Sequence, residues 1–198
     1  ISEGLVGSEM CIRDRAWSDV NGDGVDDFYL GQGKGAPGRL IILRDRQEGL
    51  KPMPLPNDGD FEDMGSLFFD ADGDGDQDLY IVSGGVECDE DDESLQDRLY
   101  LNDGSGKMTL APKGALPSAR HNGSCISAAD FDRDGDLDLF IGGRTVPGYY
   151  PTAAASQLLR NEGGGRFVDV TSDLAPALSS SRAGIVTSAV WSDIDDDG

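Results

Sequence analysis

The chain has 198 residues and a formal net charge of −22, with 38 acidic against 16 basic residues. This charge disfavours nucleic acid and anionic membrane surfaces as partners, because both attract basic patches. No apolar run approaches the ~18 residues of a membrane-spanning helix, so no membrane insertion is expected. Asp outnumbers Glu by 30 to 8, and Asp favours turns and sites for hard cations. The composition therefore predicts Gly- and Asp-rich loops between short strands.

The first fifteen residues do not share the pattern of the rest of the chain. Residues 5–15 match, codon for codon, a translation of a common transposase sequencing adapter. We therefore expect residues 1–15 to be a non-native, adapter-derived segment with no part in function. A natural N-terminus without regular structure is the alternative. The segment also lacks the basic start and the apolar stretch of a signal peptide.

The cysteine and histidine content excludes a zinc cluster. The chain has one His and three Cys, namely Cys11, Cys88 and Cys125, and no CxxC pair. Cys11 belongs to the adapter-like segment. Cys88 and Cys125 could form a disulfide in an oxidising compartment or remain two separate thiols, because spacing alone does not assign a bridge.

A nine-residue motif, D-x-[DN]-x-D-G-x-x-D, organises the remaining chain. Complete copies start at Asp19, Asp70 and Asp130, and a partial fourth copy starts at Asp193. The starts lie 51, 60 and 63 residues apart, a period that is typical of stacked supersecondary units.

The sequence around each motif predicts strands. Apolar runs such as 78–82 and 138–142 follow the motif without alternation, as in strands that are covered on both faces. About 31 residues after the start of the second and third copies, a strand, a Gly-rich turn and a further strand follow, and 39–43 takes this place in the first repeat. Another strand is predicted before each motif, as at 124–129 and 185–191.

Four strands per repeat and almost no helical period predict an all-β fold, a partial β-propeller of four-stranded blades. The motif would connect the first two strands of each blade. We expect blade units at about 16–65, 66–123 and 124–184, the start of a fourth at 185–198, and a propeller that is incomplete at both ends.

The motif predicts calcium loops. Positions 1, 3, 5 and 9 carry side-chain oxygen donors, position 7 can offer a backbone carbonyl, and position 6 is Gly. Ca²⁺ accepts 6–8 oxygen ligands at flexible geometry, whereas Mg²⁺ prefers a strict octahedron. The alternative is that the motifs are acidic surface turns that bind no ion. Three complete copies in register disfavour this alternative, and so does the repulsion between crowded carboxylates in the absence of a cation. Three bound Ca²⁺ ions would change the formal charge from −22 to −16. The candidate ligands are Asp19, Asn21, Asp23, Val25 and Asp27; Asp70, Asp72, Asp74, Asp76 and Asp78; Asp130, Asp132, Asp134, Asp136 and Asp138; and, in the partial copy, Asp193, Asp195 and Asp197.

The loops resemble the FG-GAP/VCBS repeats of integrin-like β-propellers. The resemblance extends to the hairpin at 97–104 and to the segments at 83–85, 124–132 and 142–148. They look most like the secreted bacterial branch that is often linked to ASPIC/UnbV domains. The Gly-Ala-Pro sequence at 35–37 follows the calcium loop instead of preceding it, so it adds nothing to the resemblance.

The resemblance implies a calcium-stabilised module that acts as a non-catalytic scaffold or interaction domain. Such a module would be secreted or extracellular, or would lie at the bacterial cell surface or in the periplasm, and would bind a protein or a polysaccharide. The alternative is the propeller portion of a calcium-dependent polysaccharide lyase or hydrolase.

Overall fold

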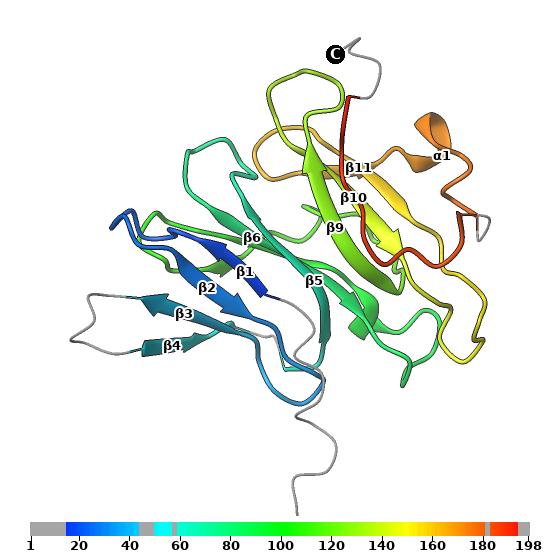
Figure 1. The fold of residues 1–198 in the computed structure, drawn as a ribbon, viewed down its shortest axis with the longest axis horizontal. Helices are drawn as coiled ribbons and strands as arrows, with labels where there is room; N and C mark the ends of the chain where they lie inside the picture. Colours follow the sequence, from blue (N-terminus) through cyan, green and yellow to red (C-terminus); the bar gives the residue numbers. More distant parts are fainter. Residues whose placement is uncertain (1–14, 44–49, 57–58, 181–182, 194–198) are drawn as a thin grey trace, which may run out of the picture.

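The computed structural model describes residues 15–43, 50–56, 59–180 and 183–193. These residues form three four-stranded antiparallel sheets, each with its strands in chain order. We call the sheets blades 1, 2 and 3; they lie side by side and do not close into a ring (Figure 1). Within these ranges, no helix is long and apolar enough to cross a membrane.

The strands of blade 1 are β1 (Arg15–Ser18), β2 (Asp27–Leu30), β3 (Arg39–Leu43) and β4 (Leu50–Pro54). Those of blade 2 are β5 (Glu62–Phe69), β6 (Asp78–Gly84), β7 (Arg98–Leu101) and β8 (Thr109–Leu110). Those of blade 3 are β9 (Gly123–Ala129), β10 (Asp138–Gly143), β11 (Gln157–Asn161) and β12 (Phe167–Asp169). Two short helical turns, η1 (Glu93–Leu95) and α1 (Thr171–Leu174), complete the described elements.

The central strand β6 shows why the apolar runs do not alternate, since all seven of its residues are buried. Successive side chains of a strand point to opposite faces of the sheet. Leu79 and Ile81 accordingly pack toward blade 1, and Tyr80 and Val82 pack toward blade 3. The strand is thus covered on both faces, as its sequence predicts.

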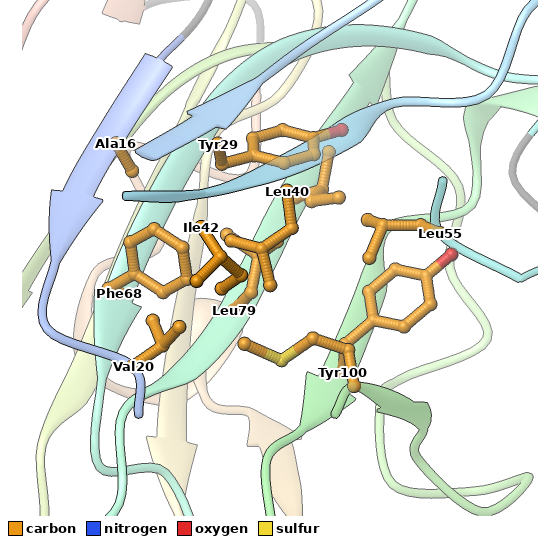
Figure 2. Packing of buried hydrophobic residues seen from close by; sticks show 11 residues of the cluster. Ala16, Val20, Tyr29, Leu40, Ile42, Leu55, Phe68, Leu79 and Tyr100 are labelled. Carbon is orange, nitrogen blue, oxygen red and sulfur yellow. The ribbon is translucent and has the colours of Figure 1, made fainter. Parts of the chain in front are cut away.

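The cores lie between the blades. The first core joins Tyr29, Leu40 and other residues of blade 1 to Phe68 and Tyr100 of blade 2 (Figure 2). The second core joins blades 2 and 3 in the same way, with Phe167 edge-on to Tyr80 at 6.3 Å between ring centroids. Each blade is therefore held by its neighbours, which is the packing of a repeat protein.

The predicted all-β, four-stranded blade architecture is confirmed, with differences at the margins. The predicted adapter segment 1–15 lies outside the described residues except for Arg15, which pairs with Leu30 at the start of β1. β5 begins at Glu62, a few residues before the expected start of the second unit, because it continues past a bulge between Asp63 and Gly65.

The predicted strand at 185–191 is wrong, because residues 184–193 have no regular secondary structure. The segment instead runs beside β9 and β10 (Figure 1). The Val186 N–H donates to the Gly143 carbonyl at 2.9 Å, and the Trp191 ring N–H donates to the Ser127 carbonyl at 3.3 Å. These scattered bonds hold the chain in place but do not form the continuous ladder that defines a strand.

Candidate metal centres

The three complete motifs form the connections β1–β2, β5–β6 and β9–β10, along one side of the molecule (Figure 1). Each loop turns through two residues with positive φ, at positions 4 and 6. Position 6 is Gly in every copy, and position 4 is Gly22, Gly73 or Arg133, the last with φ 62°. This left-handed backbone is the reason for the glycines, since side chains adopt it only at a cost.

The Asp at position 1 caps the turn from inside the loop. Its carboxylate accepts the N–H of the position-6 Gly at 2.7, 3.0 and 3.1 Å in the three loops. In the first loop these backbone bonds, led by the one from Gly24, lower the pKa of Asp19. The position-1 carboxylate is therefore held in place by the loop backbone, and in the first loop these bonds favour its ionised form.

The Asp at position 9 is the first residue of the second strand and is fully buried in all three blades, as Asp27, Asp78 and Asp138. One oxygen accepts the N–H of loop position 2, at 3.3, 2.9 and 3.0 Å. The other accepts a backbone N–H at the end of the third strand, at 2.7, 2.8 and 2.8 Å. Each position-9 side chain thus ties the loop to two strands of its own blade.

Burial raises the pKa of all three position-9 carboxyls, that of Asp78 to about 6, although the backbone bonds oppose the shift. The neighbouring loop carboxylates, such as Asp72 and Asp74 beside Asp78, raise the pKa further. The loops therefore carry unfavourable negative charge that a cation would relieve.

The carboxylates at positions 1, 3 and 9 converge. In the second loop, ligand oxygens of Asp70, Asp72 and Asp78 lie within 4.8 Å of one another. Asp130, Asp132 and Asp138 form the same group in the third loop. In the first loop, position 3 is the amide Asn21, whose Oδ1 accepts the Asp23 N–H at 2.9 Å. These groups contain hard oxygen donors only, which suits Ca²⁺.

The remaining candidate ligands have other contacts. Each position-5 carboxylate accepts the N–H of position 7 at 2.9 Å, in Asp23, Asp74 and Asp134 alike. The Asp76 carboxylate at position 7 lies against the backbone of the β7–β8 hairpin, where a Cβ on Gly104 would come within 2.7 Å of it. In the partial fourth copy, Asp193 is exposed, and Asp195 and Asp197 lie outside the described residues.

The structure also contains buried polar residues to which the sequence assigned no role. Asp63 pairs with Arg98 at 2.6 Å, and both are almost fully buried. Asn102 and Asn161 are buried in the hairpins after the third strands. The equal placement of the two Asn residues in their repeats is a signal that could have singled them out, whereas nothing in the sequence marks Asp63 and Arg98 as a pair.

Cys88 and Cys125 are free thiols, each half-buried. Burial raises the pKa of the Cys88 thiol. Of the two alternatives left open by the sequence, the described structure therefore has the separate thiols.

Comparison with known proteins adds one assignment. A search among curated proteins finds none that matches this chain. A family model for the FG-GAP-like repeat matches residues 70–141, from position 1 of the second loop through β9 and into β10. The blade 2 to blade 3 portion of this chain therefore carries an FG-GAP-like repeat.

Proposed function

We propose that this chain is a calcium-stabilised, extracellular β-propeller repeat module that acts as a non-catalytic scaffold or interaction domain. The observation that carries the proposal is the shared construction of the three loops. In each, position 1 caps the turn and position 9 is buried at the mouth of the second strand. A feature repeated at the same structural position in every blade fits a role in stability better than a role in a single reaction.

The proposed ion would supply the positive charge that the loops lack. Asp70, Asp72 and Asp78 would hold it in the second loop, and Asp130, Asp132 and Asp138 in the third. In the first loop, Asp19, Asn21 and Asp27 occupy the corresponding positions. Because position 9 is bonded to the third strand, a cation in the loop would stabilise half of the blade and not only the turn.

Calcium availability supports the proposed location. Extracellular calcium modules bind Ca²⁺ with dissociation constants of about 10⁻⁴–10⁻³ M. Loops of this affinity would be filled outside a cell and largely empty in a calcium-poor cytosol. A secreted, surface or periplasmic location therefore fits the proposed role.

The interaction role is supported by the opposite end of the blades, where antiparallel pairing places the connections between second and third strands. A cavity of about 590 Å³ lies there, lined by Val86, Arg144, Tyr150, Ile185 and neighbouring residues. Tyr150 is 83% exposed and Val86 is 56% exposed, so apolar and aromatic surface is available to a protein or polysaccharide ligand.

The test is thermal unfolding in EDTA, in 5 mM CaCl₂ and in 5 mM MgCl₂ at matched ionic strength. A site filled at ten times its dissociation constant contributes about 1.4 kcal/mol, so three sites contribute about 4 kcal/mol. For a chain of this size, this raises the Tm by on the order of 10 °C. We expect Ca²⁺ to have this effect and Mg²⁺ to have much less.

The matched variants are Asp132→Ala, which removes one carboxylate of the third group, and Asp173→Ala, which changes an exposed carboxylate in α1. The first should lose about a third of the calcium effect, and the second should lose none of it. A Tm that Ca²⁺ leaves unchanged would overturn the proposed function.

A further inference from the structure

The hairpin Asn residues occupy equivalent positions in blades 2 and 3. Asn102 follows β7 and Asn161 ends β11, and their exposed fractions are 6% and 1%. The backbone N–H of each donates to the position-9 Asp of its own blade at 2.8 Å. The backbone of each Asn is thereby anchored in its own blade. The burial of the side-chain amide requires a separate hydrogen-bond partner.

The side-chain amide of each Asn crosses to the preceding blade. Asn102 Nδ2 donates to the Val20 carbonyl at 2.8 Å, and Asn161 Nδ2 donates to the Ala71 carbonyl at 2.9 Å. Val20 and Ala71 are position 2 of the preceding blades' loops, and both are buried. The same amides have longer contacts within their own blades, at 3.2 Å to Gln77 and 3.5 Å to Leu137.

The hairpin turn that follows each Asn also contacts the loop of the preceding blade. Its Gly residues lie so close to the preceding loop that a Cβ on Gly106 would meet Val20 at 3.4 Å, and one on Gly165 would meet the Asp72 Cβ at 3.5 Å. The Gly165 N–H also donates to the Ala71 carbonyl at 3.1 Å. The turn of one blade is therefore part of the wall of the preceding blade's loop.

These contacts fix the peptide groups that separate two candidate ligands. Position 2 stands between positions 1 and 3; its N–H is bonded to the position-9 Asp of its own blade, and its carbonyl is bonded to the next blade's Asn. In Asn102→Ala the buried Val20 carbonyl would lose this partner, and in Asn161→Ala the buried Ala71 carbonyl would keep only the Gly165 N–H, so the loop would shift toward another donor. The spacing of the carboxylates at positions 1 and 3 would shift with it.

We infer that Asn102 and Asn161 are positioning residues for the calcium sites of the preceding blades, so that calcium binding in one blade is coupled to the docking of the next. This inference rests on the proposed function, because it requires that the loops bind calcium. Coupling of this kind is reciprocal: the docked hairpin strengthens calcium binding, and calcium strengthens the docking by the same factor.

The test follows calcium binding at each loop separately. The backbone N–H groups of Gly24, Gly75 and Gly135 each donate to the position-1 carboxylate, so their NMR resonances report on the three loops. Calcium titrations would compare the wild type with Asn102→Ala and Asn161→Ala. Ser105→Ala is the matched control, since the exposed Ser105 hydroxyl donates to Asp103 within its own hairpin.

We expect Asn102→Ala to weaken calcium binding at Gly24 by about fivefold or more, within the usual range of coupling between sites, and to leave Gly135 within twofold. Asn161→Ala should weaken binding at Gly75 and leave Gly24 unchanged. Equal weakening of all three loops, or weakening confined to the loop of the variant's own blade, would overturn the inference. If no wild-type Gly resonance responds to calcium, the proposed function fails and this inference fails with it.

A second measurement leaves both Asn residues intact. The Gly106 N–H donates to Asn102 Oδ1 at 3.1 Å, and the Gly163 N–H donates to Asn161 Oδ1 at 3.0 Å, so their hydrogen exchange reports on hairpin docking. Calcium should slow both exchange rates in the wild type. In Asp19→Asn the calcium effect should become smaller for Gly106, because only the loop of its own blade still acts on it, and should be unchanged for Gly163. Unchanged effects at both Gly residues would show that the loop and the next blade's hairpin are not coupled.

Discussion

The two ends of the blades bury negative charge in different ways. At the loop end, Asp27, Asp78 and Asp138 each accept two backbone N–H bonds. At the other end, Asp63 of blade 2 pairs with Arg98 at 2.6 Å. Asp63 also reaches blade 1, where it accepts the Tyr29 hydroxyl at 2.8 Å and the Gln32 N–H at 2.6 Å.

The difference is where the compensating positive charge comes from. Arg98 is part of the chain and is present under all conditions, whereas the loops depend, in our proposal, on an ion from solution. Among the residues that the structure describes, a buried ion pair occurs once, at the boundary between blades 1 and 2, while the loops repeat in every blade. The comparison therefore predicts that the stability of the loop end depends on the calcium concentration and that the stability of the end with the Asp63–Arg98 pair does not.

The largest expected effect is the loss of the buried pair. Arg98→Met would remove the guanidinium that pairs with the buried Asp63 carboxylate, together with its contact to the Phe61 ring at 4.3 Å. Breaking a buried pair from one side typically costs about 3–5 kcal/mol. We expect a loss of this size in the free energy of unfolding in urea, equal in calcium and in EDTA.

The double variant Asp63→Asn/Arg98→Met is the control for this prediction. It removes both charges of the pair and should recover most of the lost stability, because the loss of one charge from a buried pair, and not the lost volume, is the main cost. A loss that disappears when calcium is added would contradict the separation of the two ends.

An intermediate effect is expected at Asp97, a carboxyl with no ion pair in the described structure. Its oxygens accept the Tyr80 hydroxyl at 2.9 Å and the Ser83 N–H at 2.8 Å, and burial raises its pKa from 3.8 to about 7. Because the folded-state pKa lies above the unfolded one, the stabilising contribution is complete below about pH 4 and is lost as the pH rises through 7.

Asp97→Asn stays neutral and should not show this loss. Between pH 5 and pH 8 the wild type should lose on the order of 2 kcal/mol more stability than the variant. Urea unfolding of both proteins at a series of pH values, with calcium constant, measures the difference. Loop carboxyls with raised pKa values titrate in both proteins, so their contributions to the pH dependence cancel in the comparison. Parallel profiles of stability against pH in the two proteins would exclude Asp97 as the cause of the loss.

The smallest expected effect distinguishes the first loop from the second. Asn21 and Asp72 both stand at position 3 and accept the N–H of position 5, at 2.9 and 3.3 Å. Burial, and next to it the neighbouring Asp74, raises the pKa of Asp72, so its charge is unfavourable without a cation. Asp72→Asn should therefore raise stability in EDTA by less than about 1 kcal/mol and lower calcium affinity.

Asn21→Asp should have the opposite effects in the first loop. Thermal unfolding of both variants in EDTA and in CaCl₂ should thus show a reversal of sign between the two conditions. A change of the same sign in both conditions would mean that position 3 acts through loop shape and not through charge.

Much of the fold was predictable because it follows local patterns. Asp78 and Asp138 begin their strands as the motif predicts. The apolar run after Asp78 is buried on both faces, whereas the run after Asp138 leaves Phe140 half-buried. The convergence of Asp70, Asp72 and Asp78 also follows from spacing within a single loop. Such features depend on a few neighbouring residues, and so the sequence contains them directly.

The remaining features depend on contacts between distant residues. Asp63 and Arg98 meet only after β5 and β7 enter the same blade, and the target of Asn102 lies in a different blade. Residues 185–191 have the composition of a strand, but a strand also needs a partner ladder. These pairings are set by three-dimensional packing, which no local pattern in the sequence encodes.

The crossing amides also bear on how the chain emerges from a ribosome. Asn102 lies 82 residues after Val20, and Asn161 lies 90 residues after Ala71. At a synthesis rate of about 5–20 residues per second, the hairpin that completes the wall of the first or the second loop is made about 4–18 s after that loop. During translation the loop of the first or second blade therefore lacks this contact until the hairpin of the following blade has been made.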